Sequence, residues 1–291
     1  MAGSARALGS DDLVLCSGTL PRHTAFVDRI DAAVAGGFAA ISLWGRDYWG
    51  ARREGHSDAD IRTRLADAGL SVAELDPAWW WTPVTYDAES LVAIDDMEVF
   101  CYGERDMFAI ADAVGARSIN AAEVLGGRWS VDEAAESFAA LCDRAADHGL
   151  LVHLEFLPWS RIAGIAAAWE VVRGADRPNG GVAVDAWHWF RGTPDDGVLR
   201  SIPGAKVMAI QLDDAPSKPE SNPMMATLHE RRLPGAGDID LQSLIAALRA
   251  TGSNAPIGVE VFSDELHALG PHEAARRAGD AARRLLAGGS A

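Results

Sequence analysis

Short apolar segments alternate with longer amphipathic segments along most of this chain. The short segments are rich in small or branched residues and are bounded by turn residues, which is typical of strands. Their near-continuous apolar character predicts burial on both faces. Eight such strands are expected, in residues 12–20, 38–45, 70–77, 117–124, 150–158, 181–189, 206–215 and 257–263.

The segments between these strands have helical spacing. In residues 57–70 and 130–150 apolar residues recur three and four positions apart, and each segment starts with a serine that can cap a helix. The alternation predicts a single (β/α)8 TIM barrel of the α/β class rather than a doubly wound sheet. We expect residues 1–291 to form one domain, with residues 1–10 as a disordered N-terminal segment.

Four residues with oxygen donors stand at the C-terminal ends of predicted strands: Glu155, Asp185, Gln211 and Glu260. Side-chain alternation places all four on the inward side of the barrel in one layer, on the face where barrel strands converge on an active site. One such acid alone is more often a helix cap or the partner of an arginine, but four in one layer favour a cation. We expect one divalent metal ion, with Mn²⁺ ahead of Mg²⁺ and Co²⁺.

The pattern of these strand ends resembles a known group. It includes the Asp185-Ala186-Trp187-His188 motif and the segments LEFLPW, VDAWHWF, IQLDDAP, RRLPGAGDIDL and VEVFSDEL. With these elements the chain is similar to the xylose isomerase-like TIM-barrel superfamily, which includes ketose 3-epimerases and 3-dehydroshikimate dehydratases. Many members have His where this chain has Gln211, whereas relatives of the bacterial dehydratases are similar in using Gln. This departure weakens an assignment as a ketose epimerase more than it weakens metal binding.

The predicted site has a definite chemistry. A divalent metal that chelates a carbonyl and a neighbouring hydroxyl acidifies the adjacent C–H by stabilising an enediolate. Glu155 and Glu260 are the candidate catalytic base and acid, because carboxylates from different strands can address opposite faces of a sugar. The resemblance to ketose 3-epimerases implies the same pair.

Several functions remain open at this stage. We favour a metal-dependent isomerase or epimerase of a sugar or cyclic polyol ketone. The alternative is a metal-dependent lyase, either similar to 3-dehydroshikimate dehydratase or β-eliminating on a keto-glycoside. A further alternative is a sugar-binding barrel without catalysis, and a fourth is an enzyme similar to endonuclease IV.

Other residues are candidates for catalysis or substrate binding. His188 lies three residues after Asp185 and is expected to hydrogen-bond a substrate oxygen. Arg231 matches a basic residue that contacts substrate in the resembled epimerases, although a salt bridge to Asp238 or Asp240 would also explain it.

Tryptophans also gather at the predicted strand ends, and Trp159 and Trp187 are expected to contact the substrate as part of an aromatic wall. These rings could instead close the barrel mouth or form the interface of a homo-oligomer.

Charge and cysteine content limit the partners. The formal net charge of −16 argues against nucleic-acid and membrane surfaces and against an enzyme similar to endonuclease IV. A small carbohydrate-like substrate fits better. The cysteines Cys16, Cys101 and Cys142 form no CxxC pair, and the N-terminal residues contain no apolar signal segment. We therefore expect a cytoplasmic protein with reduced thiols.

Overall fold

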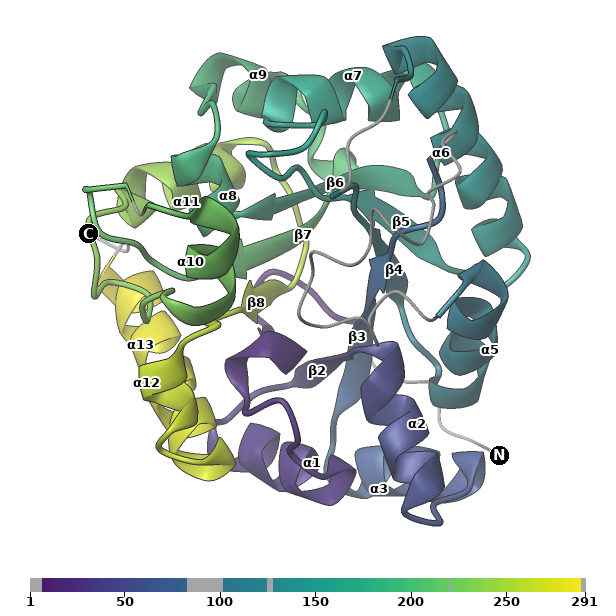
Figure 1. Ribbon diagram of the computed structural model, residues 1–291, viewed down its shortest axis with the longest axis vertical. Helices are drawn as coiled ribbons and strands as arrows, with labels where there is room; N and C mark the ends of the chain where they lie inside the picture. The colour runs from purple at the N-terminus through teal and green to yellow at the C-terminus, as the bar shows by residue number, and fades with distance from the viewer. Residues whose placement is uncertain (1–6, 83–101, 125–127, 220, 289–291) are drawn as a thin grey trace.

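The computed structural model describes residues 7–82, 102–124, 128–219 and 221–288, and its strands form the predicted barrel (Figure 1). In these residues, parallel strands pair in sequence order and the last pairs with the first, so the barrel is closed. The strands are β1 (Leu13–Leu15), β2 (Ala40–Leu43), β3 (Ser71–Ala78), β4 (Ser118–Ala121), β5 (Leu151–Leu154), β6 (Gly180–Asp185), β7 (Val207–Leu212) and β8 (Ile257–Val259).

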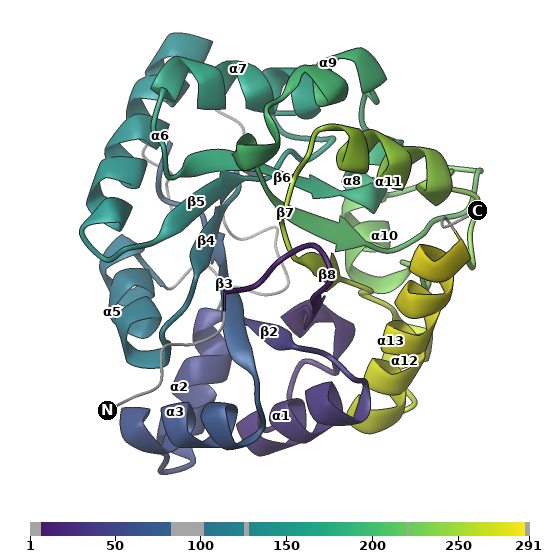
Figure 2. The ribbon, with the colours of Figure 1, turned by 180° about the vertical axis from the view of Figure 1, so that it is seen from behind.

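Helices surround the barrel on its outside, as both views of the ribbon show (Figures 1 and 2). The longer ones are α1 (Phe26–Ala35), α2 (Gly45–Arg53), α3 (Asp58–Asp67), α5 (Glu104–Val114), α6 (Val131–Ala146), α7 (Ile165–Ala175), α11 (Leu241–Ala250) and α13 (Pro271–Gly288). Shorter helices are α8 (Ala186–Arg191), α9 (Asp196–Ser201), α10 (Pro223–His229) and α12 (Asp264–His267), and Ser17–Thr19 and Gly204–Lys206 form 3-10 turns.

The predicted helix starts are confirmed at α3 and α6. Ser57 accepts a hydrogen bond from the backbone N–H of Asp60, and Ser130 accepts one from that of Glu133. The Asp60 and Glu133 carboxylates accept in return from the backbone N–H groups of the two serines. Each capping box satisfies backbone donors that the first helical turn leaves unpaired.

Apart from β3, the strands are shorter than their apolar segments. The predicted strand 181–189 is wrong beyond Asp185, because Asp185 ends β6 and caps α8, which contains Trp187 and His188. The predicted strand 12–20 likewise ends at Leu15 and continues into a 3-10 turn. Both segments stay buried after the strand ends, and apolar runs alone do not distinguish a buried strand from a buried turn of helix.

The remaining predictions on the chain are partly tested. Cys16 and Cys142 are free and buried, whereas Cys101 lies outside the described residues. Residues 1–6 of the expected disordered segment also lie outside them, and Ser10 donates its backbone N–H to Asn254. In the described parts of the chain, every helix is too short or too polar to cross a membrane.

Candidate metal centre

The predicted ligands are carried to one face of the barrel by the ends of neighbouring strands. Glu155 directly follows β5 and Glu260 directly follows β8, and the backbone of each continues the pairing, to Ala121 O at 2.9 Å and Leu212 O at 3.1 Å. Asp185 and Gln211 are register partners on β6 and β7. Glu155, Asp185, Gln211 and Glu260 are all buried. Gln211 contacts Glu74 on the opposite strand β3, and Glu155 and Glu260 line a cavity, which agrees with the inward direction expected from strand parity.

His188 joins this group more closely than the sequence indicated. One ligand atom from each of Glu155, Asp185 and His188 lies within 4.8 Å of the others, a spacing that one metal ion can bridge. The backbone explains this spacing: Asp185 caps α8 by accepting the N–H of His188 at 2.7 Å. The first turn of α8 therefore brings the His188 imidazole close to the Asp185 carboxylate, which caps that helix.

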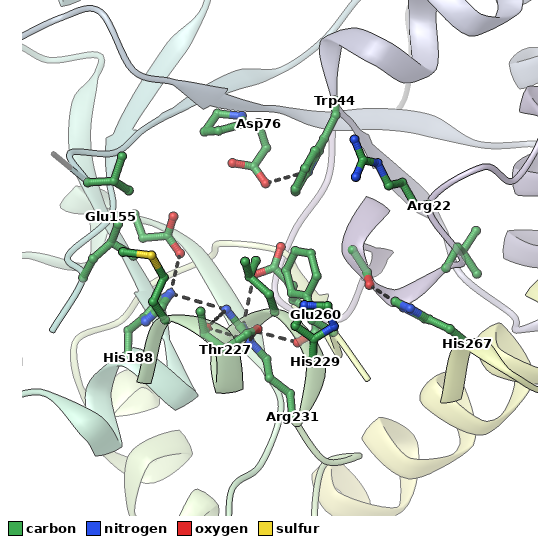
Figure 3. A pocket seen from close by; sticks show the side chains of 18 of the residues that line it. Arg22, Trp44, Asp76, Glu155, His188, Thr227, His229, Arg231, Glu260 and His267 are labelled. Atoms are coloured by element: carbon green, nitrogen blue, oxygen red, sulfur yellow. Dashed lines mark hydrogen bonds and ion pairs between the residues drawn. The ribbon is translucent and has the colours of Figure 1, made fainter. Parts of the chain in front are cut away.

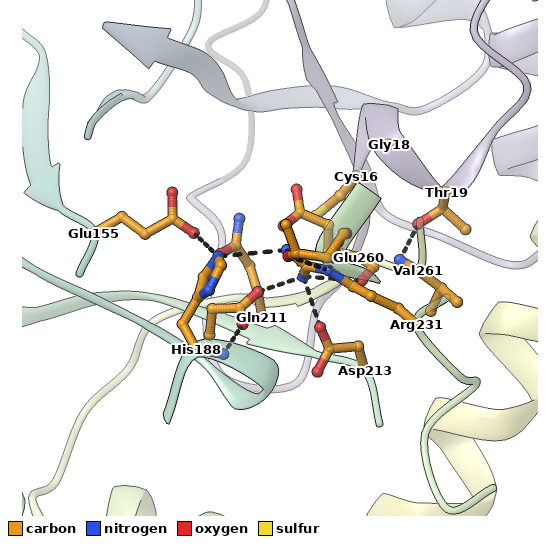
Figure 4. Close-up of polar contacts among 12 residues, drawn as sticks. Cys16, Gly18, Thr19, Glu155, His188, Gln211, Asp213, Arg231, Glu260 and Val261 are labelled. Carbon is orange, nitrogen blue, oxygen red and sulfur yellow. Dashed lines mark hydrogen bonds and ion pairs between the residues drawn. The ribbon is translucent and has the colours of Figure 1, made fainter. Parts of the chain in front are cut away.

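Arg231 lies among these acids rather than at the surface. Its Nη1 atom is 2.7 Å from Asp185 Oδ2, 2.6 Å from Asp213 Oδ2 and 3.3 Å from Glu260 Oε2 (Figure 4). The alternative salt bridge to Asp238 or Asp240 is wrong: Asp238 accepts the N–H of Ser217, and Asp240 caps α11. Figure 4 shows Arg231 reaching from its loop toward Glu260 and His188.

The buried carboxyl groups outnumber the single guanidinium group of Arg231, and their pKa values reflect this imbalance. Burial raises the pKa of Glu155, Asp213 and Glu260 well above their ordinary values, with Arg231 opposing the shift at each one. Burial also acts against Asp185, but Arg231 and then His188 outweigh it and hold the pKa of that carboxyl below its ordinary value. A single positive charge thus stabilises Asp185 as an anion and leaves excess acid around it.

His188 is held neutral by its surroundings. Burial, assisted by Arg231 and opposed by Asp185, lowers the pKa of His188 to about 3. Its Nε2 atom lies 3.6 Å from Glu155 Oε1 and 3.4 Å from Arg231 Nη2. A neutral imidazole can offer a lone pair to a metal ion or accept a hydrogen bond from a hydroxyl.

The donor set fits a divalent cation. Gln211 Oε1 and Glu260 Oε1 are buried without a hydrogen-bond partner in the described part of the protein. Buried oxygen acceptors of this kind are costly unless something positive compensates them. Carboxylate and carboxamide oxygens with one imidazole suit Mn²⁺, Mg²⁺, Co²⁺ or Zn²⁺. The residues that would hold such an ion are Glu155, Asp185, Gln211 and Glu260, with His188 in reach.

A cavity of about 440 Å³ opens beside this group, with Glu155, His188, Arg231 and Glu260 in its wall (Figure 3). Its lining includes four aromatic residues, Trp44, Trp79, Trp159 and Phe262. The ring of Trp187, by contrast, is fully buried and packs edge-on against Trp159 and His188. The geometry therefore gives Trp159 the position expected for substrate contact, and gives Trp187 a supporting position instead.

Sequence reasoning missed acids on the opposite wall of the barrel. Asp76 on β3 lines the cavity and accepts hydrogen bonds from Trp44 Nε1 at 3.1 Å and Asn120 Nδ2 at 2.9 Å. Asn120 also donates to Glu155 Oε2 at 2.7 Å. Burial, and then the charge of Glu74, raise the pKa of Asp76 to about 7. The signal was present, because Glu74 and Asp76 alternate within an apolar strand just as the second-half ligands do.

The closed barrel and the buried acids at its strand ends place this chain among TIM barrels with a candidate metal site. A family model described as xylose isomerase-like TIM barrel matches residues 30–286. The chain therefore belongs to the xylose isomerase-like TIM barrel family, and the predicted resemblance is confirmed.

The curated relatives that match this chain include two groups of enzymes. A 3-dehydroshikimate dehydratase from Pseudomonas putida is 27% identical over 280 residues, which are 94% of this chain and 40% of that protein. An inosose isomerase from Bacillus subtilis is 30% identical over 140 residues, which are 47% of this chain and 49% of that protein. The chain thus spans about two-fifths of the length of the dehydratases that it matches.

Among solved structures, the IOLI protein with a bound zinc atom is similar to this chain with a TM-score of 0.82 and 20% identity, covering 95% of this chain and 98% of that one. This likeness concerns the fold.

Proposed function

We propose that this protein is a divalent-metal-dependent enzyme that removes a proton next to the carbonyl of a sugar or cyclic polyol ketone, and that it isomerises or epimerises that substrate. The observation that carries the proposal is the set of buried acids that exceeds the charge of Arg231 and leaves oxygens of Gln211 and Glu260 unpartnered. Such a set is stable as anions only with a further cation.

We assign the metal-binding and proton-transfer roles from the positions of the residues. We assign Glu155, Asp185, Gln211 and Glu260 to the metal ion, with Mn²⁺ as the first candidate. When bound, the ion would supply Lewis acidity to a substrate carbonyl and the hydroxyl beside it. Glu155 and Glu260 project from β5 and β8 into the same cavity, and we assign them the removal and return of the proton. Burial raises the pKa of both carboxyl groups, so each holds a proton at a higher pH than an exposed glutamate does.

The substrate would be held by groups around the acids. A neutral His188 can donate to or accept from a substrate oxygen, and Arg231 lines the same cavity. Trp159 can cover one face of a ring and exclude water. The curated inosose isomerases, whose name describes action on a cyclic polyol ketone, support this class of substrate.

A lyase is the second candidate, and a specific observation favours it. The 3-dehydroshikimate dehydratases match most of this chain, whereas the inosose isomerases match about half of it. The presence of Gln211 agrees with the resemblance to the dehydratase group. Both reactions would begin with the same proton removal, and they differ in whether a β-hydroxyl then leaves.

Two measurements test the proposal. Elemental analysis of the purified protein should find near-stoichiometric divalent metal that is lost in a Glu155→Ala, Glu260→Ala double variant. The protein is then incubated in D₂O with inosose and with dehydroshikimate. If it is an isomerase, the substrate should take up deuterium at carbon, which ¹H NMR detects. Loss of water from dehydroshikimate, followed by mass spectrometry, would select the lyase. Metal-loaded protein that binds these ketones yet exchanges no carbon-bound proton would overturn both.

A further inference from the structure

A buried polar cluster lies beneath the proposed metal centre, inside the barrel. Glu74 on β3 is at its centre and is 5% exposed. Its Oε1 atom faces Gln211 Nε2 at 3.4 Å and Cys16 Sγ at 3.9 Å, and its Oε2 atom faces His153 Nε2 at 3.2 Å. His153, on β5, contacts both Glu74 and Ser118.

The donors and acceptors in this cluster can be assigned, because each hydrogen bond has a defined direction. Ser118 Oγ donates to the backbone oxygen of Ala73 at 2.9 Å, so its own oxygen remains free to accept from His153 Nε2 at 3.2 Å. The His153 ring therefore carries its proton on Nε2, and the same N–H also points to Glu74. Glu74 accepts from His153 on one side and from Gln211 on the other.

Because Glu74 accepts this hydrogen bond, it determines which end of the Gln211 amide faces the proposed metal centre. A carboxylate can only accept hydrogen bonds, so the Gln211 amide must turn its NH₂ group toward Glu74. Rotation by half a turn would place two oxygen acceptors against each other in a buried space. The amide oxygen is consequently directed away from Glu74, and it is the Gln211 atom that lacks a partner. Gln211 is the register partner of Asp185, and Figure 4 shows it together with His188 and Glu260.

We propose that Glu74 is a positioning residue that makes Gln211 a metal ligand by holding its amide oxygen toward the cation. This inference rests on the proposed metal dependence and assigns a role to a residue outside the ligand set. A carboxamide differs from a carboxylate here because only one of its two ends can bind a cation. A chain with Gln at this strand end therefore needs a fixed acceptor behind it, whereas a chain with Glu does not.

The substitution Glu74→Gln tests this directly, since it preserves size and reverses the polarity that Gln211 meets. The new amide would turn its oxygen to the N–H of His153, and its NH₂ group would face Gln211. Gln211 would then direct its own NH₂ toward the cation. We expect the dissociation constant for Mn²⁺, measured by calorimetry on chelator-stripped protein, to rise roughly 10- to 100-fold.

A double-mutant cycle separates positioning from a general effect of the lost charge. In a Gln211→Ala background there is no amide to orient, so Glu74→Gln should change the dissociation constant less than about 3-fold, a departure from additivity expected of coupled residues. Equal losses in both backgrounds, or no loss with Gln211 present, would overturn the inference while leaving the proposed function intact. Absence of Mn²⁺ binding in the unmodified chain would overturn both.

If the Glu74→Gln variant does not fold, a double variant that exchanges the residues at positions 74 and 211 provides a second test. The double variant Glu74→Gln, Gln211→Glu conserves charge and volume, and its carboxylate at position 211 has two equivalent oxygens. It should bind Mn²⁺ within about 3-fold of the unmodified chain or more tightly, as expected when coupled substitutions compensate. Circular dichroism establishes that it is folded, and a folded protein that remains 10-fold weaker would contradict the proposed role of Glu74.

Discussion

Arg231 illustrates how one residue can serve structure and function together. The sequence interpretation gave it a substrate contact, and the structure adds contacts to Asp185, Asp213 and Glu260 with almost no solvent exposure. These acids raise the pKa of Arg231 above its ordinary value, against the effect of burial, so the guanidinium stays charged. Removing a partner from a buried ionic group leaves charges uncompensated, which costs much more than losing a surface pair.

Replacement of Arg231 by Leu should therefore destabilise the metal-free protein by about 3 to 5 kcal/mol. Urea denaturation followed by circular dichroism measures this change. Saturating Mn²⁺ should recover part of the loss, because a cation would again face the acids. The matched control is Arg276→Leu, whose pairs with Glu273 and Asp280 are exposed to solvent, so this variant should lose much less stability. Equal losses in the two variants would contradict the structural role of Arg231.

Glu155 and Glu260 are predicted to be needed for turnover itself. Glu155→Gln and Glu260→Gln keep the size of each side chain and remove its ability to take up a proton, so each should lower kcat by at least about 100-fold. Deuterium exchange into the substrate measures the affected step, with metal content determined in parallel. Glu265→Gln, at an exposed position on α12, is the control and should retain full activity. Normal exchange in either site variant would sink the assignment of base and acid.

At the scale of elements, the order of strands and helices follows from local pattern. The predicted strands lie where the structure has β1 to β8, because a strand buried on both faces must be apolar along its length. Their ends were overestimated where a helical turn follows directly, as at α8. There the deciding feature is the contact of Asp185 Oδ1 with the N–H of His188, which a hydrophobic pattern does not contain.

The capping box of α6 gives a prediction independent of the site. Ser130→Ala removes the acceptor of the Glu133 N–H and should lower the free energy of unfolding by about 1 kcal/mol. Ser130→Asp, which retains a capping oxygen, should lose much less. Thermal unfolding checks both variants, and metal binding should be unchanged in each. Equal stability of the Ala and Asp variants would show that this cap contributes little to α6.

At the scale of the whole molecule, the excess of buried acid makes stability depend on pH. Burial and the charge of Glu74 raise the pKa of Asp76 from 3.8 to about 7. Below the lower value, Asp76 is protonated in both the folded and the unfolded protein. Between the two values the folded protein retains a proton that the unfolded chain has released, so this group's contribution to stability falls as the pH rises.

The unfolding temperature of the metal-free protein should accordingly fall as the pH is raised from 3.8 toward about 7. Calorimetry at a series of pH values measures the slope. Asp76→Asn removes the titrating group while keeping an oxygen that can accept from Trp44 or Asn120, so its slope should be shallower. An identical slope in the variant would assign the dependence to other groups.

The sequence by itself determined the barrel and the position of Glu155, Asp185, Gln211 and Glu260 at the ends of four neighbouring strands. These features follow from side-chain alternation within single strands and from the convergence of parallel strand ends, which need no knowledge of particular contacts. The ligand assignments themselves remain proposals, and of the four residues Glu155 and Asp185 lie within 4.8 Å of one another, together with His188.

Only the tertiary structure decided the charges and contacts around those ligands. Arg231 reaches Asp185 across 46 positions of the chain, and Gln211 meets Glu74 across 137. Neither pair shares a strand or a helix, so no local period links them, and each exists because closure of the barrel brings β3 opposite β7 and returns the Arg231 loop over β6. Side-chain periodicity reports which face a residue occupies, whereas the partner it meets there depends on the whole chain.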